Sequence, residues 1–191
     1  MPRPRLSTAS VVDAAVELVD AQGPGALTLA AVARRTGVAA PSLYKHVHSV
    51  EALQQKVSAR VTAELANVLS AAVAGRSGED AVRSLAHAYH DYALSHPGRY
   101  PLTQRVPDAQ DPEHVAASER AVQAVFAALR GYGLGGDEAI HATRVARSAL
   151  HGFVSLELDD GFGLPQDVGG TFERLVSALH VNLRNWGEVA P

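Results

Sequence analysis

The sequence predicts an all-α protein of about nine helices: an N-terminal three-helix bundle followed by a larger C-terminal helical domain. Apolar residues recur at helical spacing through most of the 191 residues, and no segment keeps the two-residue alternation of a half-buried strand. Breaks rich in glycine and proline separate the helical stretches. We expect the first domain to cover residues 1–60 and the second to cover residues 61–191.

Composition excludes several classes of protein. Hydrophobic residues make up 47% and charged residues 19%, which is typical of a globular chain and not of a disordered one. The absence of cysteine excludes disulfides, thiolate zinc sites and a cysteine nucleophile. No apolar run approaches the length of about 18 residues that a membrane span requires, and the N-terminus lacks the apolar core of a signal peptide. We therefore expect a cytoplasmic protein.

The first helix begins after Ser7, whose hydroxyl is suited to cap the free N–H groups of the first turn. Val11, Ala15 and Leu18 form its apolar stripe, and the sequence Gly23-Pro24-Gly25 ends it. This helix closes a three-helix core with the next two.

The second and third helices are short and joined by a tight turn. Thr28 is the expected N-cap of a helix over residues 29–36, and Gly37 follows at the position where a left-handed residue ends a helix. Pro41 then marks the first turn of a helix over residues 41–47. Two short helices in this order match the helix-turn-helix plan, in which the second helix enters the major groove of DNA.

The third helix has an apolar inner side and a polar, aromatic and basic outer side. Leu43 and Val47 lie four residues apart and point inward. The side chains left largely on the outside are Ala40, Ser42, Tyr44, Lys45 and His46.

At these residues the sequence resembles the TetR (tetracycline repressor) family of transcriptional regulators. The residues that carry the resemblance are Leu27-Thr28-Leu29, Ala33, Gly37-Val38, Pro41, Leu43-Tyr44, His46-Val47 and Ala52-Leu53. The resemblance implies an all-helical homodimer with an N-terminal DNA-binding domain and a C-terminal domain for ligand binding and dimerisation. Two positions depart from the family pattern: Val50 stands where relatives often have a phosphate-binding lysine, and Ala40 where relatives can carry a base-reading polar side chain.

Family position and chemistry assign roles to the outer residues. Thr28, Tyr44 and Lys45 are the expected phosphate contacts. The expected contacts to base edges or thymine methyl groups are Ala40, Pro41 and Ser42, with His46 suited to either partner. Because none of these forms a bidentate pair with a base, we expect part of the specificity to come from DNA shape.

The N-terminal residues Arg3 and Arg5 have two open interpretations. They form either a basic arm that reaches the minor groove or phosphates, or a frayed terminus.

Charge is distributed in a way that suits DNA contact at one end. Residues 1–60 carry seven basic and four acidic groups, or +3, whereas the remaining residues carry −6.

The rest of the chain reads as longer helices. Ser49 is expected to cap a helix that continues to about residue 74, and Asp137 to cap a helix that ends near residue 158. The other expected helices cover residues 79–96, a short stretch at 100–105, residues 113–131 and residues 170–186.

The last two long helices contain many small residues, such as Ala142, Ala146 and Gly152, which allow close helix approach. Val145, Leu156 and Phe172 add apolar area. We expect two such helices from each subunit to form a four-helix dimer interface. Packing within one chain is the alternative.

The run Leu150-His151-Gly152 also resembles a C-terminal type marked by Trp-His-Gly, with the tryptophan replaced.

The C-terminal domain offers side chains for a mostly apolar small-molecule pocket. The candidates are Tyr89, Tyr92, Phe126, Leu129, Thr143, Arg147 and His151. Each of them also has the plain interpretation of a core residue. Arg147 lies within an apolar helix, where it would face either an anionic ligand or an acid such as Glu157.

No enzyme, metal site or cofactor is expected. His87 and His90 are three residues apart, but spacing supplies no third metal ligand. The sequence contains no nucleophile–base arrangement and no phosphate-binding glycine loop. The leading hypothesis is a repressor that a small-molecule effector releases from a palindromic operator. The alternative is a dimeric DNA-binding protein without an effector.

Overall fold

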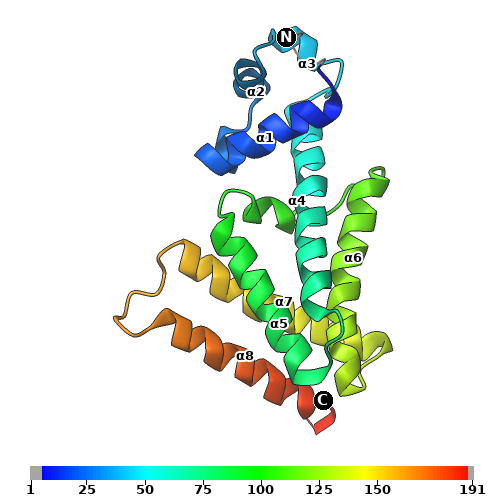
Figure 1. Cartoon of the computed structure of the whole chain (residues 1–191), viewed down its shortest axis with the longest axis vertical. Helices are drawn as coiled ribbons and strands as arrows, with labels where there is room; N and C mark the ends of the chain where they lie inside the picture. Colours follow the sequence, from blue (N-terminus) through cyan, green and yellow to red (C-terminus); the bar gives the residue numbers. More distant parts are fainter. Residues whose placement is uncertain (1–5, 189–191) are drawn as a thin grey trace. The chain divides into compact units, whose positions relative to one another are not determined.

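The computed structural model describes residues 6–188, and within that range its regular secondary structure is helical, with no strand (Figure 1). It contains eight α-helices and four short 3₁₀-helices, so the expected all-α fold is confirmed. The elements are α1 (Thr8–Gln22), η1 (Pro24–Ala26), α2 (Leu29–Thr36), α3 (Ala40–Leu43), α4 (Val50–Val73), α5 (Gly78–Ser95), η2 (Tyr100–Gln104), α6 (Pro112–Leu129), η3 (Arg130–Tyr132), α7 (Gly136–Leu158), α8 (Val168–Arg184) and η4 (Trp186–Glu188).

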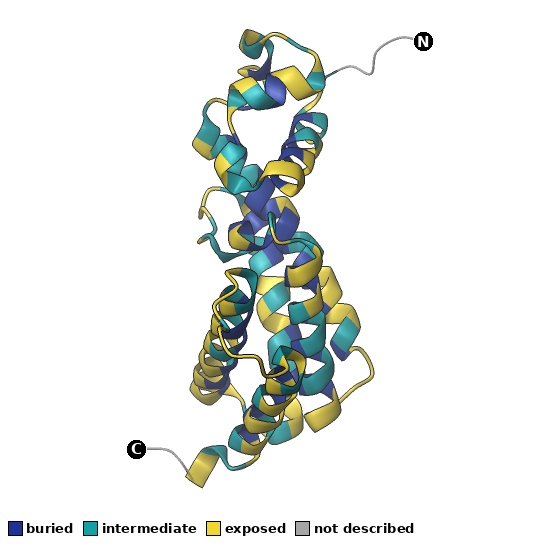
Figure 2. Cartoon of the chain, turned by 90° about the vertical axis from the view of Figure 1, so that its left-hand side faces the viewer, coloured by how far each residue is buried: buried dark blue, intermediate teal, exposed yellow. Residues whose placement is uncertain are grey.

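The chain forms two compact units. Unit 1 combines Met1–Glu64 with His96–Ser118, and unit 2 combines Leu65–Ser95 with Glu119–Pro191. Helices α4 and α6 each contribute residues to both units. Along most helices one side is buried and the other exposed, as the apolar periodicity predicts (Figure 2). No helix within residues 6–188 is long and apolar enough to cross a membrane.

Four local capping signals in unit 1 form as predicted. The hydroxyl of Ser7 accepts from the N–H of Ser10 (3.1 Å), and that of Thr28 accepts from Ala31 (3.1 Å). Ser49 accepts from Ala52 (3.0 Å) at the start of α4. Gly37 ends α2 with φ of 69°, a backbone conformation that favours glycine. These caps fix where α1, α2 and α4 begin or end.

The expected cap of α7 is wrong. Gly135 is the N-cap of α7 and makes no side-chain bond there, whereas Asp137 lies within the first turn. Gly135 and Gly136 precede Asp137, and the helix begins at Gly136, two residues earlier than it would if Asp137 were the N-cap. Asp137 still lies in the first turn, where a carboxylate interacts favourably with the helix dipole.

The third helix is shorter than the predicted range of residues 41–47. Its α-helical part is Ala40–Leu43, and a turn follows in which the N–H of His46 donates to the carbonyl of Leu43 (2.8 Å). The N–H of Val47 donates to the same carbonyl (2.9 Å), so Val47 stays on the side of Leu43. Both side chains are fully buried, as their spacing predicts.

The core of unit 1 joins α1, α2, α3 and α4. Its most deeply buried members come from all four helices: Val11, Ala15, Val19, Val32, Leu43, Leu53, Val57 and Val61. Val38, in the turn between α2 and α3, packs against this core. Burial of these side chains holds α2 and α3 against α1 and α4.

A segment distant in sequence completes unit 1. The guanidinium of Arg99 donates to both carboxylate oxygens of Asp20 on α1 (2.7 and 2.6 Å) and to Glu64 on α4 (2.8 Å). Gly98 lies so close to the carbonyl of Val19 that a Cβ would collide with it. Arg99 therefore ties the chain before η2 to α1 and to α4.

Unit 2 is built around α5, α7 and α8. The ring of His90 on α5 stacks on Phe172 of α8 (4.1 Å between centroids) and hydrogen-bonds Glu157 of α7 (2.6 Å). Arg83 of α5 donates to Glu173 of α8 (2.6 Å). Phe172 is buried within this chain, so it is not available to a partner, contrary to the expectation that it adds area to a dimer interface.

Candidate functional site

The side chains predicted to contact DNA lie on the surface of unit 1. Tyr44 is 53% exposed, Pro41 and Lys45 are also exposed, and Ala40, Ser42 and His46 are half-buried. Leu43 and Val47 fill the core side of this segment, and the half-buried Ala40, predicted to point outward, also packs against the core. The predicted polar, aromatic and basic side chains of residues 42–46 are thus exposed or half-buried, and their contact with DNA stays a prediction.

Thr28, another predicted phosphate contact, lies at the start of α2 in the same unit. Its side chain is exposed while its hydroxyl caps the N–H of Ala31. The other N–H groups of the first turn have no partner within the helix itself, and such groups attract phosphate oxygens. Arg3 and Arg5 lie outside the described residues.

The basic residues of α2 have different surroundings. Arg35 pairs with Glu17 of α1 (2.9 Å), so its charge is used to hold the two helices together. Arg34 is exposed. His48, in the turn before Ser49, is also exposed.

The residues predicted to bind a ligand are on α5, α6 and α7 of unit 2. Tyr89, Tyr92 and Leu129 are buried, at 7%, 6% and 1% exposure. The other four differ in burial: Phe126, Thr143 and His151 are half-buried and Arg147 is exposed. Their role in ligand binding stays a prediction.

Two features of α7 bear on that prediction. The hydroxyl of Thr143 is buried and has no hydrogen-bond partner. The pKa of His151 is lowered by burial and, to a smaller extent, by the nearby Arg147. Glu157, considered as a partner for Arg147, hydrogen-bonds His90. Burial and the adjacent cation therefore favour a neutral His151 imidazole.

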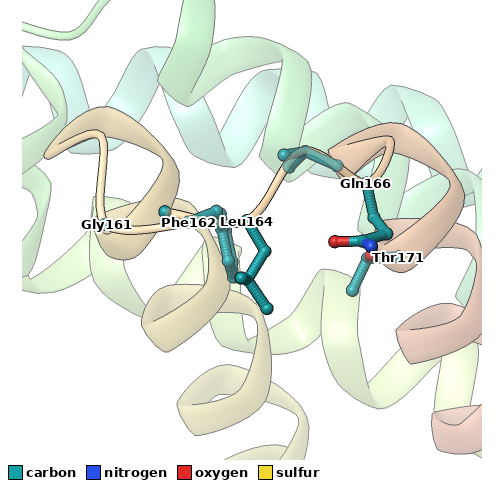
Figure 3. A pocket seen from close by; sticks show the side chains of 7 residues that line it. Gly161, Phe162, Leu164, Gln166 and Thr171 are labelled. Carbon is teal, nitrogen blue, oxygen red and sulfur yellow. The ribbon is translucent and has the colours of Figure 1, made fainter.

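An open pocket of about 360 Å³ lies at the loop between α7 and α8. In Figure 3 the side chains of Phe162 and Leu164 point to the same side of this loop, and Gln166 and Thr171 carry its polar groups. Phe162 also packs on Phe153 (4.9 Å between centroids). None of the seven predicted ligand residues lines this pocket.

The histidines considered for metal binding are engaged with carboxylates. His87 lies 3.0 Å from Glu173, and His90 lies 2.6 Å from Glu157. Within the described part of the chain, no group of three or more His, Asp or Glu residues is placed to hold a metal ion.

Comparison with family models covers both units. Residues 11–55 match the model described as "Bacterial regulatory proteins, tetR family". Residues 82–179 match "Tetracyclin repressor-like, C-terminal domain". The first match contains α2, α3 and their turn, and the second contains most of α5 and the whole of α6 and α7.

Two similar proteins are named as transcriptional regulators. The chain is 43% identical over 155 residues to the uncharacterized HTH-type transcriptional regulator Rv0681 of Mycobacterium tuberculosis, covering 81% of this chain and 71% of the relative. It is 33% identical over 189 residues to the uncharacterized HTH-type transcriptional regulator YobS of Bacillus subtilis, covering 96% and 98%.

Solved structures share the fold. Apo ActR from Streptomyces coelicolor superposes with a TM-score of 0.73 at 20% identity, with both chains fully covered. TetR-Q116A from Acinetobacter baumannii, solved in complex with minocycline, gives a TM-score of 0.71 at 20% identity, covering 95% of this chain and 98% of that one.

Proposed function

Because the chain belongs to the TetR family of bacterial regulatory proteins, whose members are transcriptional regulators and not enzymes, we propose that it is a homodimeric repressor of a palindromic operator. In this proposal the protein dissociates from the operator when a small molecule binds in unit 2. Chromosomal DNA lies in the cytoplasm, so we place the protein there.

The outer face of α3 is the observation that carries the proposal. Tyr44 and Lys45 are exposed on unit 1, while Leu43 and Val47 anchor the same segment in the core. A short helix anchored on one side presents its other side rigidly, as major-groove reading requires. Tyr44, Lys45 and Thr28 would contact phosphates, and Ala40, Pro41, Ser42 and His46 would lie nearest the bases.

Dimerisation would present this face twice. A symmetric pair of reading helices matches an inverted repeat whose half-sites bring both helices into successive major grooves. Val145, Leu156 and Val181 are exposed apolar residues on α7 and α8, and they support an interface there. A second copy would remove this apolar surface from water.

Control by a small molecule is supported by analogy and by local chemistry. The minocycline complex concerns a protein of the same fold. In this chain, Thr143 keeps a buried unpartnered hydroxyl close in sequence to Arg147 and His151. To change operator occupancy from 99:1 to 1:99, an effector must favour the released state by about 5.5 kcal/mol.

The alternative is a dimeric DNA-binding protein without a small-molecule effector. The near-complete burial of Tyr89, Tyr92 and Leu129 favours it, because these side chains then serve as ordinary core. Effector-dependent loss of DNA binding discriminates the two functions.

The test begins by selecting duplexes from random DNA with the full-length protein. We expect enrichment of an inverted repeat, and no enrichment of any sequence would contradict the proposal. Binding to the selected duplex is then measured by fluorescence anisotropy in the presence of minocycline and other candidate effectors. Release by at least one compound supports the repressor, and unchanged binding across the set favours the alternative.

A further inference from the structure

A network of charged side chains joins α1 to α4 within unit 1. On α4, Arg60 donates to Glu64 one helical turn later (3.0 Å), and its guanidinium also lies 3.6 Å from the carboxylate of Asp13 on α1. Arg99 donates to Glu64 (2.8 Å) and, through two nitrogens, to Asp20 of α1 (2.7 and 2.6 Å). Asp13 and Asp20 are seven residues apart, so they lie on one face of α1. The network therefore connects this face to α4 at two points.

The two connections differ in geometry and in exposure. The side chains of Arg60 and Asp13 are both more than half exposed, and an ion pair of this kind contributes little. The side chain of Arg99 is only 19% exposed, and its guanidinium holds both carboxylate oxygens of Asp20. A two-point bond between a guanidinium and a carboxylate fixes direction as well as distance. Arg99 therefore provides the more rigid of the two connections.

Arg99 lies close in sequence to a point where the chain passes from one unit to the other. There are three such passages: after Glu64 within α4, before His96, and after Ser118 within α6. Glu64 is the last residue of unit 1 on α4, and Arg99 follows His96 by three residues. The bond between Arg99 and Glu64 thus joins two of the three passages, and the bond to Asp20 fastens α1 to the same place.

This placement matters for a protein that reads DNA as a dimer. The proposed interface between the two copies is on α7 and α8 of unit 2, whereas α3 belongs to unit 1. The separation of the two reading faces therefore depends on how firmly the helices of unit 1 are held where the chain leaves that unit. Apolar packing holds α1 and α4 together but is not directional. The bonds of Arg99 are directional, so they restrict the angles between α1 and α4.

We propose that Arg99 is a positioning residue for DNA recognition: by fastening α1 to Glu64, it determines which spacing of operator half-sites the dimer accepts. Arg99 acts through Asp20 and Glu64 and does not itself contact DNA. Recognition of a single half-site then depends on the outer face of α3, and the spacing between half-sites depends on Arg99. The inference rests on the proposed function, because a spacing exists only for a dimer that reads an inverted repeat.

The test measures affinity by fluorescence anisotropy for a set of duplexes. The set contains the inverted repeat selected by the full-length protein, versions with one or two base pairs added to or removed from the spacer, and a duplex with a single half-site. Wild type should lose about tenfold in affinity for each base pair of altered spacing, because each shifts and rotates one half-site. Arg99→Met should bind all spacings within about threefold of one another. Arg76→Met, which breaks an exposed pair with Asp80, is the control and should keep the wild-type profile.

Ratios between duplexes separate positioning from stability, because loss of folded protein or of a DNA contact lowers affinity for every spacing by the same factor. If Arg99→Met does not fold, Asp20→Ala replaces it, since this variant frees α1 and leaves the bond between Arg99 and Glu64 in place. Wild-type ratios in the folded variant overturn the inference, and so does a wild type that binds all spacings of the repeat equally. A wild type that binds one half-site as tightly as the repeat contradicts the proposed function as well.

Discussion

Single side chains carry the interaction with DNA in the proposed mechanism. Lys45 is exposed in the turn that follows α3. Contact between its ammonium group and a DNA phosphate would add affinity without sequence preference. Tyr44 beside it is 53% exposed, which is unusual for a large aromatic residue that serves only the core. The sequence predicted that both side chains are exposed, because the spacing of Leu43 and Val47 determines which side of the segment faces the core.

Replacing Lys45 by alanine should weaken binding to all duplexes to a similar extent. It should also lower the slope of log K against log salt concentration by about one per subunit, because one phosphate contact is lost. Anisotropy titrations over a range of KCl concentrations measure this slope. Arg130→Ala, which removes an exposed cation from unit 2, is the control and should leave the slope unchanged. An unchanged slope for Lys45→Ala would remove it from the phosphate contacts.

The buried His114 should make stability depend on pH. Its pKa in the folded state lies below the ordinary 6.5 because burial disfavours the charged ring. Between these two values the unfolded chain binds more protons, so the free energy of unfolding falls as pH drops below about 6.5. Urea denaturation at several pH values should show a weaker pH dependence for His114→Leu than for wild type.

Thr62→Val provides the non-titrating comparison. It removes a buried unpaired hydroxyl and should raise the free energy of unfolding by about 1 kcal/mol at every pH. Equal pH dependence in wild type and His114→Leu would show that His114 does not cause the acid loss of stability.

At the scale of helices, local sequence predicts what local interactions decide. Ser7, Thr28, Ser49 and Gly37 were predicted as caps because each bond or backbone angle involves residues within four positions. The extent of α3 was not predicted, because the turn after Leu43 depends on hydrogen bonds that periodicity does not determine. Contacts between distant segments were missed for the same reason.

The cap at Gly37 permits a matched test. Gly37→Ala should lower the free energy of unfolding by about 1 kcal/mol, because φ is positive there although no atom lies within 4 Å of the new Cβ. Gly25→Ala meets equally open space without a positive φ, and it should be neutral or slightly stabilising. Chemical denaturation of both variants measures the difference. Equal effects would mean that backbone strain at residue 37 is negligible.

Arg99 shows what periodicity cannot reveal. Its guanidinium joins Asp20 and Glu64, which are 79 and 35 residues away in sequence. The pair with Asp20 raises the pKa of Arg99, so the guanidinium stays charged. Arg99→Met should lower the free energy of unfolding by about 2 kcal/mol. Arg76→Met, which breaks an exposed pair with Asp80 one helical turn away, should cost less than about 0.5 kcal/mol. Equal losses in urea denaturation would contradict a special role for Arg99.

For the whole molecule, the proposed reading of an inverted repeat requires two copies of the chain. Phe172, Val176 and Leu179 of α8 are buried within one chain, whereas Val181 is 49% exposed. The sequence predicted an interface on α7 and α8 but could not separate residues that pack within the chain from those that remain exposed. Both kinds share the same apolar character and helical spacing.

Val181→Asp should weaken self-association, because burying an unpaired carboxylate in an apolar interface is costly. Leu94→Asp, at a residue 39% exposed on α5, is the control and should leave self-association unchanged. Sedimentation equilibrium measures both. Unchanged association of Val181→Asp would exclude that part of α8 from the interface.

In the proposed dimer, the outer face of α3 reads DNA twice, once from each subunit. The most direct measurement is a stoichiometric titration of the selected inverted repeat, beside a duplex in which about 5 base pairs, half a helical turn, are inserted between the half-sites. We expect two chains per duplex and a large loss of affinity on insertion, because the two half-sites then face opposite sides of the DNA. One chain per duplex, with equal affinity for both duplexes, would contradict it.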